Sequence, residues 1–349
     1  MGTEIKVAVA LSGGVDSAVA ALLLSRQGLA VRGVHLRLGD GSIVPPDLPA
    51  LAEHLGLPLE ILDLRKDFAR LVVDYFIDHY FKGHTPNPCV RCNAAVKFGV
   101  LWERVKAAGA THLATGHYVR LVPGPGGALR LFRGRDPAKD QSYFLCQIPR
   151  DLLPHLLFPL GGLTKPEVRA QFRQSGLAAV ADCQESQDIC FIPQGDYQDF
   201  LWARRGRRGC PGDLVDRQGR VLGRHRGVEN YTVGQRRGLR TPAREPYYVL
   251  QILPECNQVV IGPKSELYSQ GLRARGMNWL IDPPAGELTV TAMIRYRHPG
   301  VQAVLKPGTG DRVEVLFDGP QAAVTPGQAV AFYEGDCLLG GAWIEERLA

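Results

Sequence analysis

The chain has 349 residues, which exceeds one typical domain and predicts two or three. With 45% hydrophobic and 22% charged residues it has a globular composition. It has no apolar run of about 18 residues, so no membrane span is predicted. The first strand begins without a preceding signal-peptide pattern, so we expect a cytoplasmic protein. The net charge of +6 is compatible with a polyanionic partner.

The segment Lys6–Ala21, KVAVALSGGVDSAVAA, predicts a strand, a tight glycine turn and a helix in succession. The strand covers Lys6–Leu11, the turn Ser12–Ser17, and the helix starts at Ala18. This order places backbone N–H groups and the positive end of a helix dipole at one point. Such a point attracts phosphate.

The residue types inside the turn fit a phosphate ligand. Gly13 and Gly14 allow positive φ and a close approach to the backbone, and Ser12 and Ser17 add hydroxyl donors. Asp16 could hold Mg²⁺ against a pyrophosphate. No lysine follows the glycines and the spacing is not G-x-G-x-x-G, so neither of the common nucleotide motifs is present.

Strands and helices alternate after this segment, which predicts an α/β fold with a doubly wound parallel sheet. The expected strands are Ala30–Leu38, Leu59–Leu64 and Thr111–Thr115, and the expected helices are Leu48–Leu55, Phe68–Phe81 and Val96–Ala108. The pattern is helical again over Arg150–Leu177, where Thr164–Pro166 marks a helix start.

Ligands bind such sheets at the carboxyl ends of the strands, where the glycine turn and Thr115–Tyr118 are both expected. Gly116 would let an adenine or ribose lie against the backbone. His117 is either a phosphate contact or a hydrogen-bonded structural histidine.

The composition changes near Arg205, where glycine, proline and arginine become dense. Short apolar runs then predict strands and a small barrel or sandwich at the end of the chain. These strands are Tyr247–Ile252, Gln258–Ile261, Leu288–Tyr296, Arg312–Phe317, Ala329–Tyr333 and Cys337–Ile344. We therefore predict a catalytic domain at 1–204, a small central β domain at 205–275 and a β-barrel at 276–349.

Arginines concentrate between residues 204 and 240, and this density favours a nucleic-acid face over a merely solvated surface. They are Arg204, Arg205, Arg207, Arg208, Arg217, Arg220, Arg224, Arg226, Arg236, Arg237 and Arg240.

Two cysteine segments call for a chemical explanation. In TPNPCVRCN, Pro86 and Pro88 argue for a shaped loop that carries the pair Cys89 and Cys92. A C-x-x-C pair suits zinc, redox or iron–sulfur chemistry, and the lack of a second ligand pair disfavours structural zinc. Cys190, within ESQDICFIP, would by itself be read as a buried apolar cysteine.

A series of motifs along nearly the whole chain resembles the tRNA-specific 2-thiouridylase family, whose SGGVDS string is the PP-loop of ATP pyrophosphatases. The other motifs are TPNPCVRCN, ATGHY, KDQSYFL, ICFIP, YTVGQRRGL, EPYYV, RYRHPG and AVTPGQAVAFYEGDCLLGG. The resemblance implies a PP-loop domain, a central β domain and a C-terminal β-barrel. It implies ATP-dependent 2-thiolation of the wobble uridine of tRNA, by adenylation of uracil O2 and sulfur transfer.

The resemblance also implies the site residues. ATP, with Mg²⁺, would contact Ala10, Leu11, Ser12, Gly13, Gly14, Val15, Asp16, Ser17, Leu36 and Gly116. Cys190 would receive a persulfide sulfur and Cys92 would be the nucleophile, which leaves a Cys92–Cys190 disulfide. Such chemistry needs a lowered thiol pKa, for which the neighbouring Arg91 is our hypothesis.

The implied partner is the anticodon loop of tRNA, with lysine, glutamate and glutamine isoacceptors expected. Its contacts would be Asn87, Pro88, Cys89, Lys139, Asp140, Gln141, Arg295 and Tyr296. The target base must leave the anticodon stack to reach the cysteines. A cysteine desulfurase or a relay protein would supply the persulfide.

One residue departs from the family pattern, since many members have aspartate where this chain has Cys89. Cys89, Cys92 and Cys190 could instead hold a [4Fe–4S] cluster with one iron open for sulfide, as in related PP-loop thiolating enzymes. The persulfide and the cluster route both stay open. Two other functions remain as alternatives, a PP-loop amide ligase and a non-catalytic RNA-binding protein that retains a nucleotide site.

Overall fold

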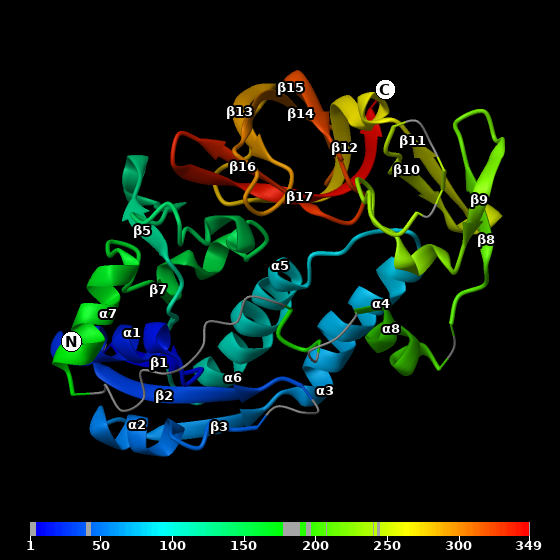
Figure 1. Cartoon of the computed structure of the whole chain (residues 1–349). Helices are drawn as coiled ribbons and strands as arrows, with labels where there is room; N and C mark the ends of the chain where they lie inside the picture. The colour runs from blue at the N-terminus through cyan, green and yellow to red at the C-terminus, as the bar shows by residue number, and fades with distance from the viewer. Residues whose placement is uncertain are drawn as a thin grey trace. The chain divides into compact units, whose positions relative to one another are not determined.

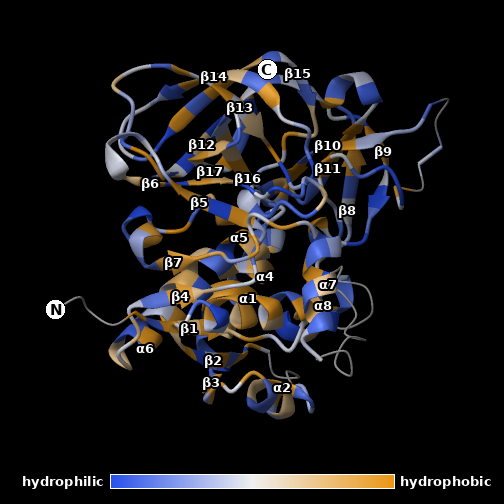
Figure 2. Cartoon of the chain, turned by 90° about the vertical axis from the view of Figure 1, so that its left-hand side faces the viewer, coloured by the Kyte–Doolittle hydropathy of each residue, from blue (hydrophilic) through white to orange (hydrophobic). Residues whose placement is uncertain are grey.

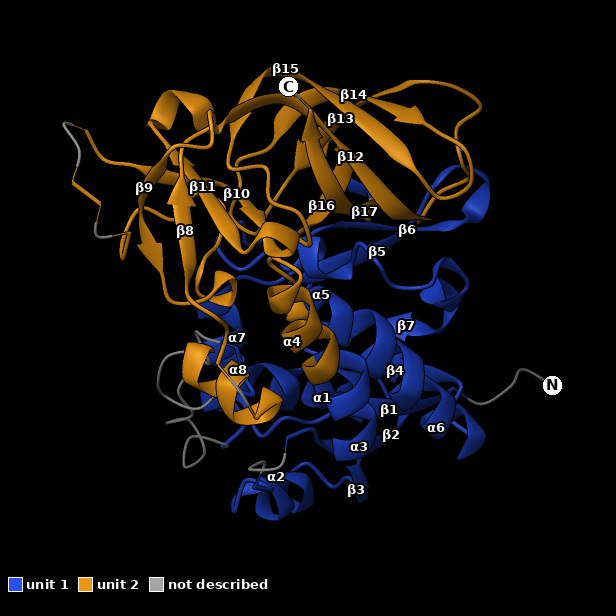
Figure 3. Cartoon of the chain, turned by 90° about the vertical axis from the view of Figure 1, so that its right-hand side faces the viewer, with its two compact units in different colours: residues 1–72, 89–191, 336–339 blue, residues 73–88, 192–335, 340–349 orange. Residues whose placement is uncertain are grey.

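The computed structural model describes residues 5–39, 43–176, 189–192, 197–206, 208–239, 241–242 and 245–348. The chain forms two compact units (Figure 3). Unit 1 consists of residues 1–72, 89–191 and 336–339, and unit 2 of residues 73–88, 192–335 and 340–349. Within the described ranges, no helix is long and apolar enough to cross a membrane.

Unit 1 is built on a five-stranded parallel sheet in the order β3-β2-β1-β4-β7. In Figure 1, β1, β2 and β3 lie one beside the next. The strands are β1 Lys6–Ala10, β2 Ala30–Arg37, β3 Leu59–Asp63, β4 His112–Ala114 and β7 Leu156–Leu157. The chain builds outward from β1 to β3 and then returns to the other side of β1. The strand order therefore reverses between β1 and β4, which confirms the predicted doubly wound sheet and marks its ligand-binding edge.

The core of this sheet lies against helices α1 (Val15–Arg26) and α7 (Lys165–Gln174). Apolar residues gather on β1, β4 and α1 (Figure 2). Val7 and Val9 of β1 pack in one buried cluster with small α1 residues such as Ala18 and with Phe172 of α7. The short side chains of α1 let this helix lie close to the strand that carries the glycine turn.

The remaining helical segments of this half follow the predicted pattern with one correction. They are α2 Leu48–His54, α3 Arg65–Phe68, the π-helix η1 Ala69–Val73, α4 Asp74–Phe81, α5 Pro88–Cys92, the π-helix η2 Asn93–Val100 and α6 Leu101–Ala107. The predicted loop over TPNPCVRCN is wrong from Pro88 onward, because a helix begins there. Proline is tolerated at a first helical position, where its missing N–H needs no partner.

A second correction concerns Arg150–Leu177, which the pattern predicted as helical. The structure has a 3₁₀-helix η5 at Arg150–His155, then β7, and only then α7. Pro154, Pro159 and the Gly161–Gly162 pair break the run. The predicted helix start is confirmed, since Thr164 and Glu167 form a capping box at α7.

Unit 1 also has a hairpin that the sequence did not reveal, formed by β5 (Val119–Pro123) and β6 (Leu129–Arg133). A short 3₁₀-helix at Pro125–Gly127 lies in its turn, and another, η4, covers Ser142–Leu145. Cys337 and Leu338, at the start of β17, extend the hairpin by pairing with β6.

Unit 2 contains helix α8 (Tyr197–Arg205), a four-stranded sheet and a barrel. The sheet has the order β10-β11-β8-β9, with β8 Gly212–Val215, β9 Val221–His225, β10 Tyr248–Leu253 and β11 Gln258–Gly262. Short 3₁₀-helices cover Val228–Asn230, Pro254–Cys256 and Lys264–Leu267.

The last strands close into a six-stranded β-barrel in the order β12-β15-β14-β13-β16-β17, because β12 and β17 also pair. They are β12 Tyr268–Trp279, β13 Leu288–Met293, β14 Val301–Pro307, β15 Val313–Ala322, β16 Ala329–Glu334 and β17 Cys337–Leu348. Of the two predicted forms, barrel or sandwich, the structure has the barrel. The strand predicted over Leu288–Tyr296 is too long, since β13 ends at Met293.

Candidate active site

The glycine turn leaves β1 at the sheet edge where β4 also ends. Val9 of β1 pairs in register with Ala114 of β4, so Leu11–Ser17 and Thr115–Tyr118 follow two adjacent parallel strands. The two segments that the sequence assigned to one ligand crevice therefore leave the sheet side by side.

The turn is held in shape by its own serines. Ser12 N–H donates to Ser17 Oγ at 3.1 Å, Gly14 N–H donates to Ser12 Oγ at 3.3 Å, and Ser17 Oγ donates to the Gly14 carbonyl at 3.0 Å. Gly13 has φ +88°, a left-handed conformation that favours glycine, and a Cβ there would lie 2.9 Å from Pro45 Cγ. Both hydroxyls predicted as phosphate donors thus shape the loop.

The loop leads into α1 with Gly14 at the N-cap, and no described side chain caps this end of the helix. The N–H groups of the first turn then need a partner from outside the helix. Together with the helix dipole they form an anion site. Ser12 is exposed and Gly14 half-buried, so a phosphate can reach the turn. These features fit the triphosphate of ATP.

Gly116 brings the two loops into direct contact. A Cβ at Gly116 would lie 3.0 Å from the Asp16 carbonyl carbon, 3.0 Å from Ser17 N and 3.1 Å from Asp16 O. These distances are shorter than ordinary van der Waals contact. The neighbour of Gly116 is therefore the backbone of the glycine turn, and any side chain at this position would press on the phosphate site.

Asp16 is the centre of a polar network that the sequence did not indicate. Lys165 Nζ donates to its two carboxylate oxygens at 2.8 and 2.9 Å, and Tyr118 Oη donates to Oδ1 at 2.7 Å. Tyr118 follows β4 and Lys165 opens α7. No local signal connects residues so far apart in the chain.

The structure places the predicted contact on β2, Leu36, and the histidine after β4, His117, near the glycine turn and the end of β4 respectively. Leu36 is a half-buried residue of β2, and the neighbouring His35 Nδ1 lies 2.8 Å from the carbonyl of Leu11, at the entry to the glycine turn. Burial lowers the pKa of His117 well below its usual value, and its Nδ1 lies 2.7 Å from Thr115 Oγ1. His117 is therefore a neutral, hydrogen-bonded structural residue here.

The cysteines of the C-x-x-C pair lie on one turn of α5 instead of in a loop. Cys89 and Cys92 are three residues apart, so their side chains share a helix face. Cys89 is exposed and Cys92 is buried. Cys190 is exposed, contrary to the apolar burial that its neighbours suggested, and the adjacent Phe191 packs edge-on against Phe68 with ring centroids 5.6 Å apart.

The three thiols lie close enough to affect one another's ionisation. Burial above all, with smaller contributions from the neighbouring thiols Cys190 and Cys89, raises the pKa of Cys92 to about 12. Loss of solvation also raises the pKa of Cys89 and of Cys190, and a charge on Cys190 adds to the rise at Cys89. All three are therefore protonated thiols at neutral pH in this conformation.

A cation beside these thiols is Lys97, on η2, whereas the sequence suggested Arg91 for this role. Lys97 lowers the pKa of all three thiols and that of His117, so it lies within electrostatic reach of both the cysteines and the end of β4. Arg91 Nε donates to the carbonyl of Leu71 instead. Lys97 is five residues from Cys92, a spacing that carries no sequence signal.

A [4Fe–4S] cluster spreads its thiolate ligands over separate irons, whereas a single metal ion needs its ligands in one coordination sphere. Among the residues that the structure describes, no three histidine, cysteine, aspartate or glutamate side chains are grouped so that they could hold a metal ion. Mg²⁺ makes a different demand, since it binds one or two carboxylates together with phosphate oxygens and water. Asp16 can meet that demand.

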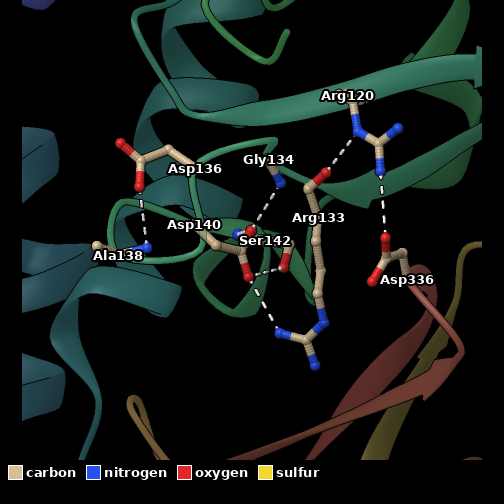
Figure 4. Close-up of polar contacts among 8 residues, drawn as sticks. All are labelled: Arg120, Arg133, Gly134, Asp136, Ala138, Asp140, Ser142 and Asp336. Carbon is tan, nitrogen blue, oxygen red and sulfur yellow. Dashed lines mark hydrogen bonds and ion pairs between the residues drawn. The ribbon is translucent and has the colours of Figure 1, made fainter. Parts of the chain in front are cut away.

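The segment with Lys139, Asp140 and Gln141 forms a tight loop after β6 (Figure 4). Asp140 accepts hydrogen bonds from Gly134 N–H at 3.0 Å, Ser142 N–H at 3.1 Å and Ser142 Oγ at 2.9 Å, and it pairs with Arg133 at 3.1 Å. Gln141 Oε1 accepts the N–H of Tyr118 at 3.0 Å. Asp140 and Gln141 therefore hold the loop in shape.

The other predicted RNA contacts belong to unit 2. Arg295 and Tyr296 lie in the turn after β13, where Arg295 is exposed and donates to the carbonyl of Ala322, and Arg297 stacks over the Tyr296 ring at 5.5 Å. Asn87 and Pro88 are buried.

Four arginines of the arginine-rich segment form ion pairs inside unit 2. Arg205 pairs with Asp78, Arg217 with Glu266, Arg220 with Asp216 and Arg224 with Asp213. Arg207 and Arg240 lie outside the described residues. These pairs reduce the positive field that the sequence suggested, and the nucleic-acid face stays a prediction.

Three family models match successive parts of the chain. They are the tRNA methyl transferase HUP domain at residues 5–194, the tRNA methyl transferase PRC-barrel domain at 198–263 and the aminomethyltransferase beta-barrel domain at 269–344. The three segments follow the order of the predicted domains.

Relatives named tRNA-specific 2-thiouridylase MnmA match nearly the whole chain. The protein from Geobacter metallireducens is 45% identical, with 98% of this chain and 97% of the relative covered. The protein from Carboxydothermus hydrogenoformans is 46% identical, with 98% of each chain covered. The protein from Acidithiobacillus ferrooxidans is 48% identical, with 97% of this chain and 98% of the relative covered.

Proposed function

The chain belongs to the tRNA-specific 2-thiouridylase family, and from this membership we propose that it replaces O2 of the wobble uridine of tRNA with sulfur, using ATP. This makes it a tRNA-uridine 2-sulfurtransferase. The observation that carries the sulfur chemistry is the grouping of Cys92 and Cys190 within mutual electrostatic reach. An amide ligase would need neither thiol, so that alternative is not favoured.

The first step activates the oxygen. Uracil O2 attacks the α-phosphorus of ATP, the bond from that phosphorus to the α–β bridging oxygen breaks, and pyrophosphate leaves with the electron pair. The first-turn N–H groups of α1 and the dipole of this helix stabilise the charge on the phosphates. Asp16 would hold Mg²⁺, which neutralises phosphate charge when it is bound.

The second step transfers sulfur, and we propose that Cys190 carries it as a persulfide. Cys190 is exposed, so a persulfide donor such as a cysteine desulfurase or relay protein can reach it. The outer persulfide sulfur loses its proton and attacks C2 of the adenylated uracil, and AMP departs. Cys92 then loses its proton and attacks Cys190 Sγ, which releases the thiocarbonyl and forms a Cys92–Cys190 disulfide. A thiol reductant restores the cysteines.

The persulfide route is the one that this proposal develops, and the cluster route stays open as its alternative. Cys89 then has another use in this proposal. It lies one helical turn before Cys92 on the same face, so it would border the extruded base.

The proposed RNA partner is the anticodon loop of lysine, glutamate and glutamine tRNAs. In this proposal Asn87, Pro88 and Cys89 border the target base, Lys139, Asp140 and Gln141 supply a loop contact, and Arg295 and Tyr296 offer a charge and an aromatic face for an unpaired base. The enzyme would work in the cytoplasm, and the division into domains at 1–204, 205–275 and 276–349 is part of the same proposal.

The test is mass spectrometry of tRNA nucleosides after incubation with the full chain, ATP, Mg²⁺ and a persulfide donor. We expect 2-thiouridine with the native protein and with Cys256→Ser, an exposed cysteine of unit 2 that serves as the control. Cys92→Ser and Cys190→Ser should each lose at least about a hundredfold in rate, the scale of removing a covalent nucleophile. Native product formation with either serine variant would contradict the proposal.

A further inference from the structure

The phosphate loop contains no lysine of its own, yet the structure brings one to it from a distant helix. Lys165 stands 149 residues after Asp16 and binds both oxygens of its carboxylate. The Lys165 side chain is 9% exposed, whereas that of Asp16 is 35% exposed. The lysine is therefore shielded from solvent, whereas the carboxylate of Asp16 remains accessible from the side of the loop.

The position of Lys165 is fixed by its own backbone. Its N–H donates to Asp136 Oδ2 at 2.9 Å. The preceding Thr164 donates to Glu167 through N–H and Oγ1, at 2.7 and 3.0 Å, and Arg135 pairs with Glu167. Helix α7 itself packs in the same buried cluster as α1 through Val168 and Phe172. The lysine therefore has little freedom to leave the loop.

Stability alone gives a poor reason for this arrangement. A buried ion pair pays a desolvation penalty that can cancel its attraction, and apolar residues of similar volume often serve as well or better. A lysine is, by contrast, an effective point charge for phosphate oxygens. In loops of the G-x-x-x-x-G-K type, a lysine reaches the β- and γ-phosphates, and the turn at Ser12–Ser17 lacks that residue.

We propose that Lys165 is the phosphate-binding residue for the pyrophosphate half of ATP. Its ammonium donates to oxygens of the β- and γ-phosphates, and the hydroxyl of Tyr118 sets the position of the charge by holding Asp16. When the bond between the α-phosphorus and the bridging oxygen breaks, that oxygen gains negative charge beside Lys165. This inference rests on the proposed function, in which ATP is cleaved between the α- and β-phosphates.

The test compares the affinities of ATP, pyrophosphate and AMP by titration calorimetry on the full chain with Mg²⁺ and without tRNA. Lys165→Met removes the charge and keeps much of the apolar stem. It should weaken ATP and pyrophosphate binding about tenfold to a hundredfold, the size of a charge-assisted hydrogen bond, and AMP binding less than about threefold. Arg173→Ala also removes one positive charge from the same helix, but at an exposed residue, and it should change none of the three affinities.

A purely structural role for Lys165 predicts a different pattern. Thermal unfolding would then shift while the three ligands bound natively, or all three affinities would fall together, and either result overturns the inference. Lys165→Arg, which keeps a charge, should recover part of the pyrophosphate affinity. If Lys165→Met does not fold, Tyr118→Phe removes only the hydrogen bond to Asp16 and should weaken pyrophosphate but not AMP. An unchanged pyrophosphate affinity in that variant also overturns it.

These outcomes are separable from the proposed function. Lys165-dependent pyrophosphate binding without any 2-thiouridine from the native enzyme would refute thiolation and leave the lysine assignment standing. The formation of 2-thiouridine together with an unchanged pyrophosphate affinity in Lys165→Met would do the reverse.

Discussion

Replacing Gly116 by alanine tests whether the two loops at the sheet edge act as one site. The added Cβ would lie 3.0 to 3.1 Å from three backbone atoms of Asp16 and Ser17. Carbon contacts are favourable at about 3.5–4.0 Å, so the loops must separate by about half an ångström. The backbone φ of Gly116 is not left-handed, so alanine brings only this steric conflict.

The size of the effect follows from that overlap. Overpacking of a well-packed region costs about 1–3 kcal/mol, and we expect the free energy of unfolding to fall by that amount. The displaced atoms belong to the first turn of α1 and to Asp16, whose bonds to Tyr118 and Lys165 are 2.7 to 2.9 Å long. If about 1.4 kcal/mol of the cost falls on the bound state, the Kd for ATP rises about tenfold.

The assay combines denaturant unfolding with ATP titration calorimetry on the full chain. Gly162→Ala is the matched control, because a Cβ there meets no atom within 4 Å and its φ is not left-handed. It should leave stability and ATP affinity unchanged. If Gly116→Ala keeps native ATP affinity and native stability, the contact between the two loops has no role in nucleotide binding and the reasoning fails.

Three further predictions concern single side chains. Burial raises the pKa of Cys92 from 9.0 to about 12. The rate of its alkylation by iodoacetamide, followed by mass spectrometry, should therefore rise about tenfold per pH unit between pH 7 and 10. A plateau of this rate below pH 9 would contradict the prediction. Because the folded pKa exceeds the unfolded one, the associated stability is complete below about pH 9 and is lost toward pH 12, so Cys92→Ser should lose less stability than the native chain over that range. Asp140→Ala removes the acceptor for three hydrogen-bond donors and for Arg133, so it should lower the free energy of unfolding by about 2–4 kcal/mol and weaken tRNA binding. Asp140→Asn should lose less stability. A native melting temperature for Asp140→Ala would contradict this prediction. Glu229 is fully buried in unit 2 and accepts hydrogen bonds from Trp202 Nε1 and Gly209 N–H. Glu229→Ala should therefore lower the free energy of unfolding by about 2–4 kcal/mol, and Glu229→Gln, which keeps an amide oxygen, by about half of that. An alanine variant as stable as the native chain in the same unfolding assay would contradict this.

The parallel sheet was predictable because its strands carry a strong local signal. The segments that became β1, β2 and β3 are short apolar runs bounded by turn residues, and each lies within one or two residues of its prediction. Strand β7 has two residues and depends on pairing with β4, so no pattern in the chain could reveal it. Strand β12 contains two glycines, and its pairing register shifts along its length, which weakens any period of two.

The candidate site was predictable only where its residues are consecutive. The glycine turn is one continuous segment, so its shape and its place at a strand end follow from local rules. The partners of Asp16 come from the end of β4 and the start of α7, and only the tertiary fold brings them together. The helical start at Pro88 was missed for the opposite reason, since two prolines look like a loop until one of them is placed at a first helical position.

The raised pKa values of the thiols bear on which sulfur acts as the nucleophile. At neutral pH a buried Cys92 with a pKa of about 12 holds almost no thiolate. A direct attack of this thiol on an activated base would therefore be slow. A persulfide S–H is more acidic than a thiol, so a persulfide on the exposed Cys190 would be ionised where Cys92 is not. Cys92 is then needed only after the sulfur has bonded to the base, when its attack on Cys190 displaces a stabilised thiocarbonyl sulfur as leaving group. The lower pKa of that leaving group favours the exchange. Burial disfavours the Cys92 thiolate in either role, but only the second role has a good leaving group to offset this. Lys97, which lowers the pKa of both thiols, favours each step.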